Sequence, residues 1–205
     1  MAFTDGVEGL SVKEGLTSEN LDRVHPELQD RVQSLATFAA SMGYRIQINS
    51  GWRSYTEQNY LYQQSIARKS KYPAAKPGTS KHNGPETNFQ YSLAIDINII
   101  DSNGKFLKTA SYFNIYCQYG AYWENLPPIT VNGTDYYPEW GGRFSDPVHY
   151  GYRTPKLTTQ LPSSCGTTAP LPSQVPIIVQ STQPSNKPTE VAAAEVAAAK
   201  TICAG

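Results

Sequence analysis

Three side chains in this sequence have the chemistry of metal ligands: His82, Asp96 and His149. Two imidazoles and one carboxylate suit a zinc ion. Three protein ligands leave one position open for water, as in a catalytic rather than a structural site. Asp146 lies three residues before His149, where its carboxylate could take a proton from that water. The combination predicts a zinc-dependent hydrolase that holds one zinc ion.

Asp96 carries more of this prediction than either histidine alone. It interrupts the apolar run 93–100, and a buried carboxylate needs a cationic partner. That partner is either a metal ion or a basic side chain such as Arg53. His25 precedes a proline at a helix start, so we expect it to be structural.

The spacing of apolar and turn-forming residues predicts the elements that position these side chains. We expect helices over 25–42, 54–69 and 113–122, and strands over 44–49, 93–100 and 148–150. Asn103-Gly104 favours a tight turn after the second strand. The order of the elements predicts an α+β domain, with helices packed on a small antiparallel sheet.

Composition changes near Arg153. We assign residues 1–153 to the folded domain and 154–188 to an extended proline-rich linker. Residues 189–205 are rich in alanine and favour a short helical tail.

Charge and hydropathy exclude several classes of function. The formal net charge is +0, without the basic excess of a nucleic-acid binder. No apolar run is long enough to span a bilayer. The first residues do not have the pattern of a secretory signal. We therefore expect synthesis in the cytoplasm and action elsewhere only after release or delivery.

The cysteines and aromatic residues allow weaker predictions. Cys117, Cys165 and Cys203 are odd in number and widely spaced, so we expect free thiols in a reducing compartment. Aromatic residues gather over 112–152, where they either line a ligand surface or pack in the core.

Four runs in this order resemble motifs of the M15 group of zinc peptidases. They are Gly51-Trp52-Arg53-Ser54 with Gln58, Ser80-Lys81-His82, Ala94-Ile95-Asp96, and Glu139 to Phe144 followed by Asp146 to Tyr150. This group contains D-alanyl-D-alanine carboxypeptidases and L-alanyl-D-glutamate endopeptidases of phage endolysins. The resemblance implies a Hedgehog/DD-peptidase-like fold followed by an extended tail.

One departure from the family pattern concerns the first ligand. Thirteen residues separate His82 from Asp96, more than the family spacing, and Ser92 stands where the family has glycine. Residues 83–91 look like an inserted loop. It either borders the cleft and changes substrate choice or takes His82 away from the metal.

The resemblance also implies roles for particular side chains. Zinc would be held by His82, Asp96 and His149, and Asp146 would act as general base and then acid. The alternative for Asp146 is a surface ion pair with Arg143 or Arg153.

Further roles follow from the matched motifs. Arg53 would face the oxyanion or a substrate carboxylate, unless it forms a structural ion pair. We expect Ser80, Gln58 and Trp140 on the substrate side. For Ser80 the alternative is to orient a ligand, and for Trp140 it is core packing.

The implied substrate is the peptide stem of bacterial peptidoglycan, cut at L-Ala–D-Glu or at D-Ala–D-Ala. The tail suits attachment to a phage or a contractile injection particle. Two alternatives stay open: an inactive M15-like binding or structural module, and a zinc peptidase that acts on another peptide.

Overall fold

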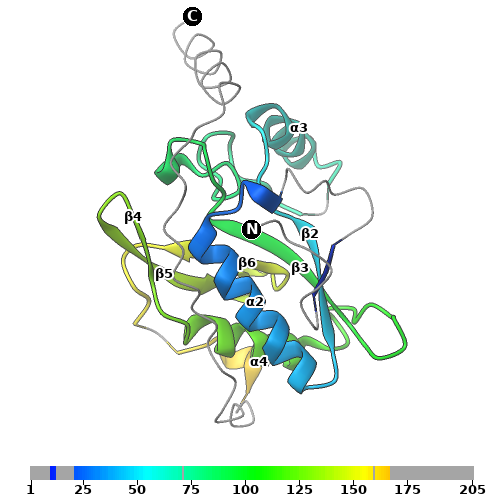
Figure 1. Cartoon of the computed structure of the whole chain (residues 1–205). Helices are drawn as coiled ribbons and strands as arrows, with labels where there is room; N and C mark the ends of the chain where they lie inside the picture. The colour runs from blue at the N-terminus through cyan, green and yellow to red at the C-terminus, as the bar shows by residue number, and fades with distance from the viewer. Residues whose placement is uncertain (1–9, 13–20, 71, 159, 167–205) are drawn as a thin grey trace, which may run out of the picture.

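A computed structural model describes residues 10–12, 21–70, 72–158 and 160–166 (Figure 1). Its strands form one sheet in the order β1-β2-β3-β6-β5-β4. The strands are β1 (Leu10–Val12), β2 (Arg45–Ser50), β3 (Ala94–Ile100), β4 (Ile129–Val131), β5 (Thr134–Trp140) and β6 (His149–Arg153). The helices are α2 (Pro26–Ser41), α3 (Tyr55–Ile66) and α4 (Phe113–Glu124), with 3₁₀ turns η1 (Pro85–Thr87), η2 (Gly141–Phe144) and η3 (Ser163–Cys165). The predicted α+β class is confirmed. The edge strand β1 pairs in parallel with β2, and the other neighbouring strands are antiparallel.

The core forms where α2 and α4 pack against the sheet. Leu28, Val32 and Leu35 recur at helical spacing on α2 and are fully buried. Phe38, one turn further, stacks on Tyr122 of α4 with ring centroids 4.3 Å apart. In Figure 1, α2 crosses over the strands, whereas α3 stands apart from the other two helices. α3 buries one residue, Gln58, so its place near the site is set by polar contacts.

The register of the central strands places one ligand beside another. Asp96 of β3 pairs with His149 of β6 on one side and with Ser50 of β2 on the other. Directly opposed residues of antiparallel strands have Cβ atoms about 4.5–5.5 Å apart. The sheet itself therefore brings together two side chains that are 53 residues apart in sequence.

The hairpin β4–β5 was missed by the sequence analysis. Its strands are joined by Asn132-Gly133, and both residues have positive φ, 50° and 77°. This is the residue pair that favours a two-residue hairpin turn. The strands themselves are short or contain proline, so their periodicity is weak. Trp140 ends β5 and is fully buried.

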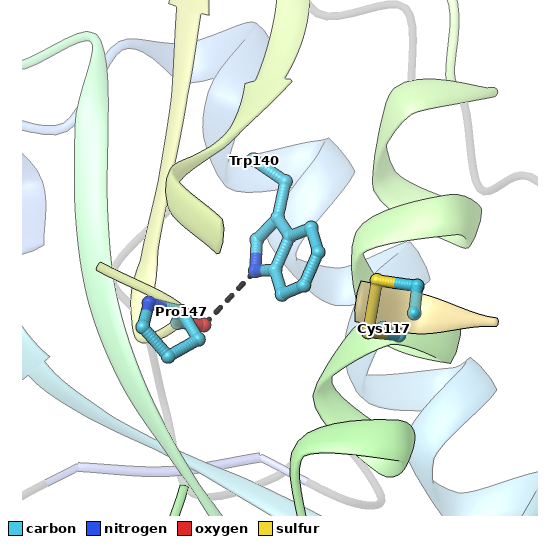
Figure 2. Close-up of a disulfide and its surroundings, with 4 residues drawn as sticks. Cys117, Trp140 and Pro147 are labelled. Carbon is cyan, nitrogen blue, oxygen red and sulfur yellow. Dashed lines mark hydrogen bonds between the residues drawn. A yellow bond between two sulfur atoms is a disulfide. The ribbon is translucent and has the colours of Figure 1, made fainter. Parts of the chain in front are cut away.

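The prediction of free thiols is wrong for two of the three cysteines. Cys117 of α4 and Cys165 of η3 form a disulfide with a Cα–Cα distance of 5.6 Å (Figure 2). Leu161 packs against the core and Cys165 lies within it, so the chain returns to α4 after β6. Sequence spacing cannot show such a return, because it depends on tertiary packing.

Within the expected linker, Leu161 and η3 thus lie against the domain. The rest of that linker, the predicted helical tail over 189–205, and Cys203 lie outside the described residues, so the domain boundaries stay predictions. Within the described residues, the helices lack the combination of length and apolar character that crossing a membrane requires. The aromatic cluster is mostly core: Tyr116, Tyr119, Trp123, Trp140, Tyr150 and Tyr152 are buried.

Candidate metal centre

His82, Asp96 and His149 each direct one ligand atom at a common point. Asp96 Oδ1 lies 3.3 Å from His82 Nε2 and 3.1 Å from His149 Nδ1. The two ring nitrogens are 3.3 Å apart. Ligands held about 2.0–2.1 Å from a tetrahedral zinc ion are separated by about 3.3 Å. The three atoms therefore fit three corners of a zinc coordination sphere, and the group is one that could hold a metal ion.

His82 is fixed from behind by the backbone of another segment. Its Nδ1 lies 2.7 Å from the carbonyl oxygen of Gly51. A carbonyl only accepts, so Nδ1 carries the proton and Nε2 offers its lone pair to the site. The backbone N–H of Arg53 donates to the His82 carbonyl at 3.0 Å. Ser80 Oγ accepts from the His82 N–H at 3.3 Å.

The inserted loop 83–91 does not take His82 away from the site. The N–H of Leu93 donates to the Lys81 carbonyl at 2.9 Å, so the loop leaves and returns at one place. Thr87 Oγ1 donates within the loop, at 2.9 Å from the Gly84 carbonyl and 2.7 Å from that of Tyr91. Gly84 has φ +65°, and a Cβ there would lie 1.7 Å from the Tyr91 oxygen. The insertion is thus a closed loop built beside the ligand.

Arg53 binds the side of Asp96 that faces away from the histidines. Its guanidinium forms an ion pair with Asp96 Oδ2, while Nε donates to Ser50 Oγ at 2.8 Å. Gln58 Oε1 accepts from the guanidinium at 3.4 Å. The basic partner considered for Asp96 is therefore observed: Oδ2 binds Arg53, while Oδ1 faces the two histidines, where it could bind a metal ion.

Electrostatics keep His82 and Asp96 in the forms that bind metal. Burial, with the charge of Arg53, lowers the pKa of His82 to about 4, so its ring is neutral at neutral pH. Burial would raise the pKa of Asp96, but His82, His149 and Arg53 hold it well below its usual range. A neutral imidazole and an ionised carboxylate are the ligating states.

Asp146 lies near the same group with a different environment. Burial raises the pKa of its carboxyl, the charge of Asp96 raises it further, and His149 and Arg53 oppose the shift. Its backbone carbonyl accepts from the His149 N–H at 3.0 Å. A raised pKa favours proton transfer near neutral pH.

The arginines considered as alternative partners of Asp146 form ion pairs elsewhere. Arg143 contacts both carboxylate oxygens of Glu124 at 2.7 Å. Arg153 contacts Glu139 at 3.1 Å.

The three residues expected on the substrate side are all buried, and each has different contacts. Gln58 is 1% exposed and donates to the Ala75 carbonyl at 2.8 Å, so both ends of its amide are engaged. Ser80 is buried behind His82. Trp140 is 0% exposed, and its Nε1 donates to the Pro147 carbonyl at 2.9 Å (Figure 2). The burial of Ser80 and Trp140 favours the alternatives, a ligand support and a core side chain, and their contact with substrate stays a prediction. Direct contact of Gln58 with substrate stays a prediction.

The sequence analysis assigned no role to three residues that have a place at the site, although Gly51 and Phe144 belong to its matched runs. They are Gly51, whose carbonyl orients His82; Glu124, which holds Arg143 and the Trp140 N–H; and Phe144, whose ring lies 5.7 Å from that of His149. Phe144 had a signal, since it is an aromatic residue at the end of the matched run 139–144. A backbone carbonyl has none.

A His/Asp/His group with an ionisable acid beside it is the arrangement found in metal-dependent hydrolases. Comparison with known proteins indicates which kind of hydrolase this chain resembles. Residues 21–117 match the family model VanY: D-alanyl-D-alanine carboxypeptidase. Residues 21–117 therefore resemble a VanY-type carboxypeptidase domain, in agreement with the motifs that resemble those of the M15 group of peptidases.

Three individual proteins similar to this chain are the following. The peptidoglycan L-alanyl-D-glutamate endopeptidase CwlK of Bacillus subtilis is 29% identical over 130 residues, which cover 62% of this chain and 71% of CwlK. The L-Ala D-Glu endopeptidase ChiX of Serratia marcescens is 17% identical, with a TM-score of 0.43 over 73% of this chain and 94% of that one. A D,D-pentapeptidase VanY from a VanB-type cassette, solved with Zn(II), is 19% identical, with a TM-score of 0.40 over 63% of this chain and 72% of that one.

Proposed function

We propose that this chain is a zinc-dependent peptidase that hydrolyses an amide bond in the peptide stem of bacterial peptidoglycan. The observation that carries the proposal is the triangle of ligand atoms from His82, Asp96 and His149, with edges of 3.1–3.3 Å, beside the carboxyl of Asp146. The family match to a carboxypeptidase and the likeness to CwlK support the wall peptide as substrate.

Each side chain has one task in this proposal. The three ligands would hold the ion, which would supply Lewis acidity and lower the pKa of a bound water. Asp146 accepts the proton of the attacking water and passes it to the departing amine. Arg53 uses three of its five N–H donors on Ser50, Gln58 and Asp96, so donors remain for a substrate carboxylate or the developing oxyanion.

The place of action is part of the proposal. The Cys117–Cys165 disulfide supports work outside the reducing cytoplasm, where such bonds persist. We propose that the protein reaches the wall after release or delivery, and that the tail attaches it to a phage or injection particle. Removal of residues 167–205 should then abolish attachment and leave hydrolysis intact; unchanged attachment would refute the role of the tail.

The test of the function is a zinc-dependent digestion. Purified full-length protein should contain one zinc per chain and release stem peptides from purified peptidoglycan. A chelator should stop the release, and added zinc should restore it. Mass spectrometry of the products then identifies the bond, L-Ala–D-Glu or D-Ala–D-Ala. Zinc binding without any cleavage would favour the alternative of an inactive module.

A further inference from the structure

Phe144 is a large apolar side chain left exposed beside the metal centre. It is 50% exposed, whereas Trp140, four residues earlier, is completely buried. Its ring centroid lies 5.7 Å from that of His149, with the planes tilted by 59°. Single exposed apolar side chains are common on protein surfaces. What distinguishes Phe144 is that its ring lies next to that of His149, one of the candidate metal ligands.

The turn that carries Phe144 is fixed by contacts on both sides. A Cβ on Gly141 would lie 2.2 Å from the Asp146 carbonyl oxygen, and one on Gly142 would lie 2.3 Å from the Trp140 ring. The turn therefore lies directly on these neighbours. Arg143 is held by both oxygens of Glu124. The ring of Phe144 is thus presented by a rigid turn rather than by a loose loop.

The ring also stands on the accessible side of the ligand group. The His82 side chain is 4% exposed and closed off by the Gly51 carbonyl, whereas those of Asp96 and His149 are 16% and 15% exposed. A substrate must therefore approach from the side of Asp96 and His149. Phe144 borders His149 there, and the base Asp146 follows two residues later.

The two candidate bonds share one apolar group. In L-Ala–D-Glu and in D-Ala–D-Ala, the residue that supplies the scissile carbonyl is an alanine, of L configuration in the first and D configuration in the second. Its methyl group is attached to the carbon next to the scissile carbonyl. On the amine side, D-Glu has a side chain that ends in a carboxyl group, whereas the terminal D-Ala has a methyl side chain and a free α-carboxylate. An aromatic face suits the methyl group common to both.

We propose that Phe144 is a specificity residue whose ring contacts the methyl group of the alanine on the carbonyl side of the scissile bond. This inference rests on the proposed function. It predicts that the enzyme distinguishes alanine from glycine at this position and that Phe144 provides the distinction.

The test compares two synthetic stem peptides, one with alanine and one with glycine at that position. Phe144→Ala in the full chain should lower kcat/KM about 10-fold on the alanyl peptide, the size expected for one lost methyl contact, and little on the glycyl peptide. Phe144→Leu should recover part of the preference. Zinc per chain should stay at the wild-type value in both variants.

Phe106 provides a matched control. It is 48% exposed, and it pairs with Ile100 at the far end of β3, four residues or about 13 Å along the strand from Asp96. Phe106→Ala removes a similar apolar surface and should keep the wild-type preference for alanine.

The outcomes separate the two proposals. An unchanged ratio of alanyl to glycyl kcat/KM in Phe144→Ala refutes the inference and leaves the proposed function standing. If Phe144→Ala loses zinc, the ratio of alanyl to glycyl kcat/KM is measured in Phe144→Leu instead. A ratio equal to that of the wild type then refutes the inference. A wild-type protein that cleaves no wall peptide refutes both.

Discussion

His82 Nδ1 donates to the carbonyl oxygen of Gly51 across 2.7 Å, and this contact decides which nitrogen of the ring faces the metal centre. Gly51 directly follows β2, and Asp96 pairs with Ser50 in the same sheet. One stretch of backbone thus supports two ligands: it orients His82 through Gly51 and Asp96 through Ser50 and Arg53. Residues 50–53, which precede the first metal ligand in the sequence, therefore hold His82 and Asp96 in position.

The base and a ligand should respond differently to substitution. Asp146→Asn keeps the size of the side chain but cannot accept the proton, so activity should fall at least ~100-fold while zinc stays bound. His149→Ala removes a ligand atom, so zinc and activity should be lost together. Zinc per chain and peptidoglycan hydrolysis, measured on the same preparations, check both. Loss of zinc from Asp146→Asn would mean that this carboxylate is a ligand.

Arg53→Lys should weaken zinc binding although the charge is kept. A lysine ammonium cannot reach Ser50, Gln58 and Asp96 together as the planar guanidinium does. Loss of such support for a metal ligand costs about 10–100-fold in affinity. Competition with a coloured chelator measures it. Arg45→Lys, an exposed position at the start of β2, is the control and should bind zinc like the wild type. Equal zinc affinities of the two variants would show that Arg53 does not support Asp96 as a metal ligand.

His25 should make the zinc-free protein sensitive to mild acid. Burial lowers the pKa of its ring from 6.5 to about 4. The ring packs edge-to-face with that of Tyr91, with the two ring centroids 6.0 Å apart. Between these pH values the unfolded chain binds a proton that the folded chain does not, so acid favours unfolding. The contribution of the neutral His25 ring to the free energy of unfolding is complete above pH 6.5. It decreases by at most about 3 kcal/mol as the pH falls from 6.5 through 4.

Urea unfolding of zinc-free protein from pH 7.5 to 4.5 measures this loss. His25→Phe keeps a ring against Tyr91 but does not titrate, so its stability should fall less with acid. Parallel curves for the two proteins would show that His25 does not cause the sensitivity. The other titrating groups are common to both and cancel in the comparison.

Cys165→Ser should destabilise the domain. The disulfide joins residues 48 apart, for which the chain-entropy model gives about 4 kcal/mol. Urea unfolding with and without a reductant measures the difference, and the reductant should affect the wild type but not the variant. Cys203→Ser is the control, because Cys117 and Cys165 pair with each other. It should unfold like the wild type; a similar loss in this variant would refute the pairing.

The amino-acid sequence by itself determined the elements with strong local patterns. The periodicity of α2, the apolar run of β3 and the Ser54 cap of α3, which accepts from the Glu57 N–H at 3.1 Å, are all confirmed. Residue types also indicated the metal-binding group, because the chain has only 3 histidines, which leaves few ways to combine imidazoles with a carboxylate. Local periodicity reflects the geometry of one element, so it can be read from neighbouring residues.

Tertiary structure decided the features that depend on residues far apart in the chain. The burial of Trp140 follows from its contact with Gly120 of α4, and the disulfide follows from the return of the chain to the same helix. The closure of the loop after His82 likewise depends on the hydrogen bond between Lys81 and Leu93. Packing and hydrogen bonding are pairwise properties of surfaces that meet only in the folded chain, so one segment read alone does not contain them.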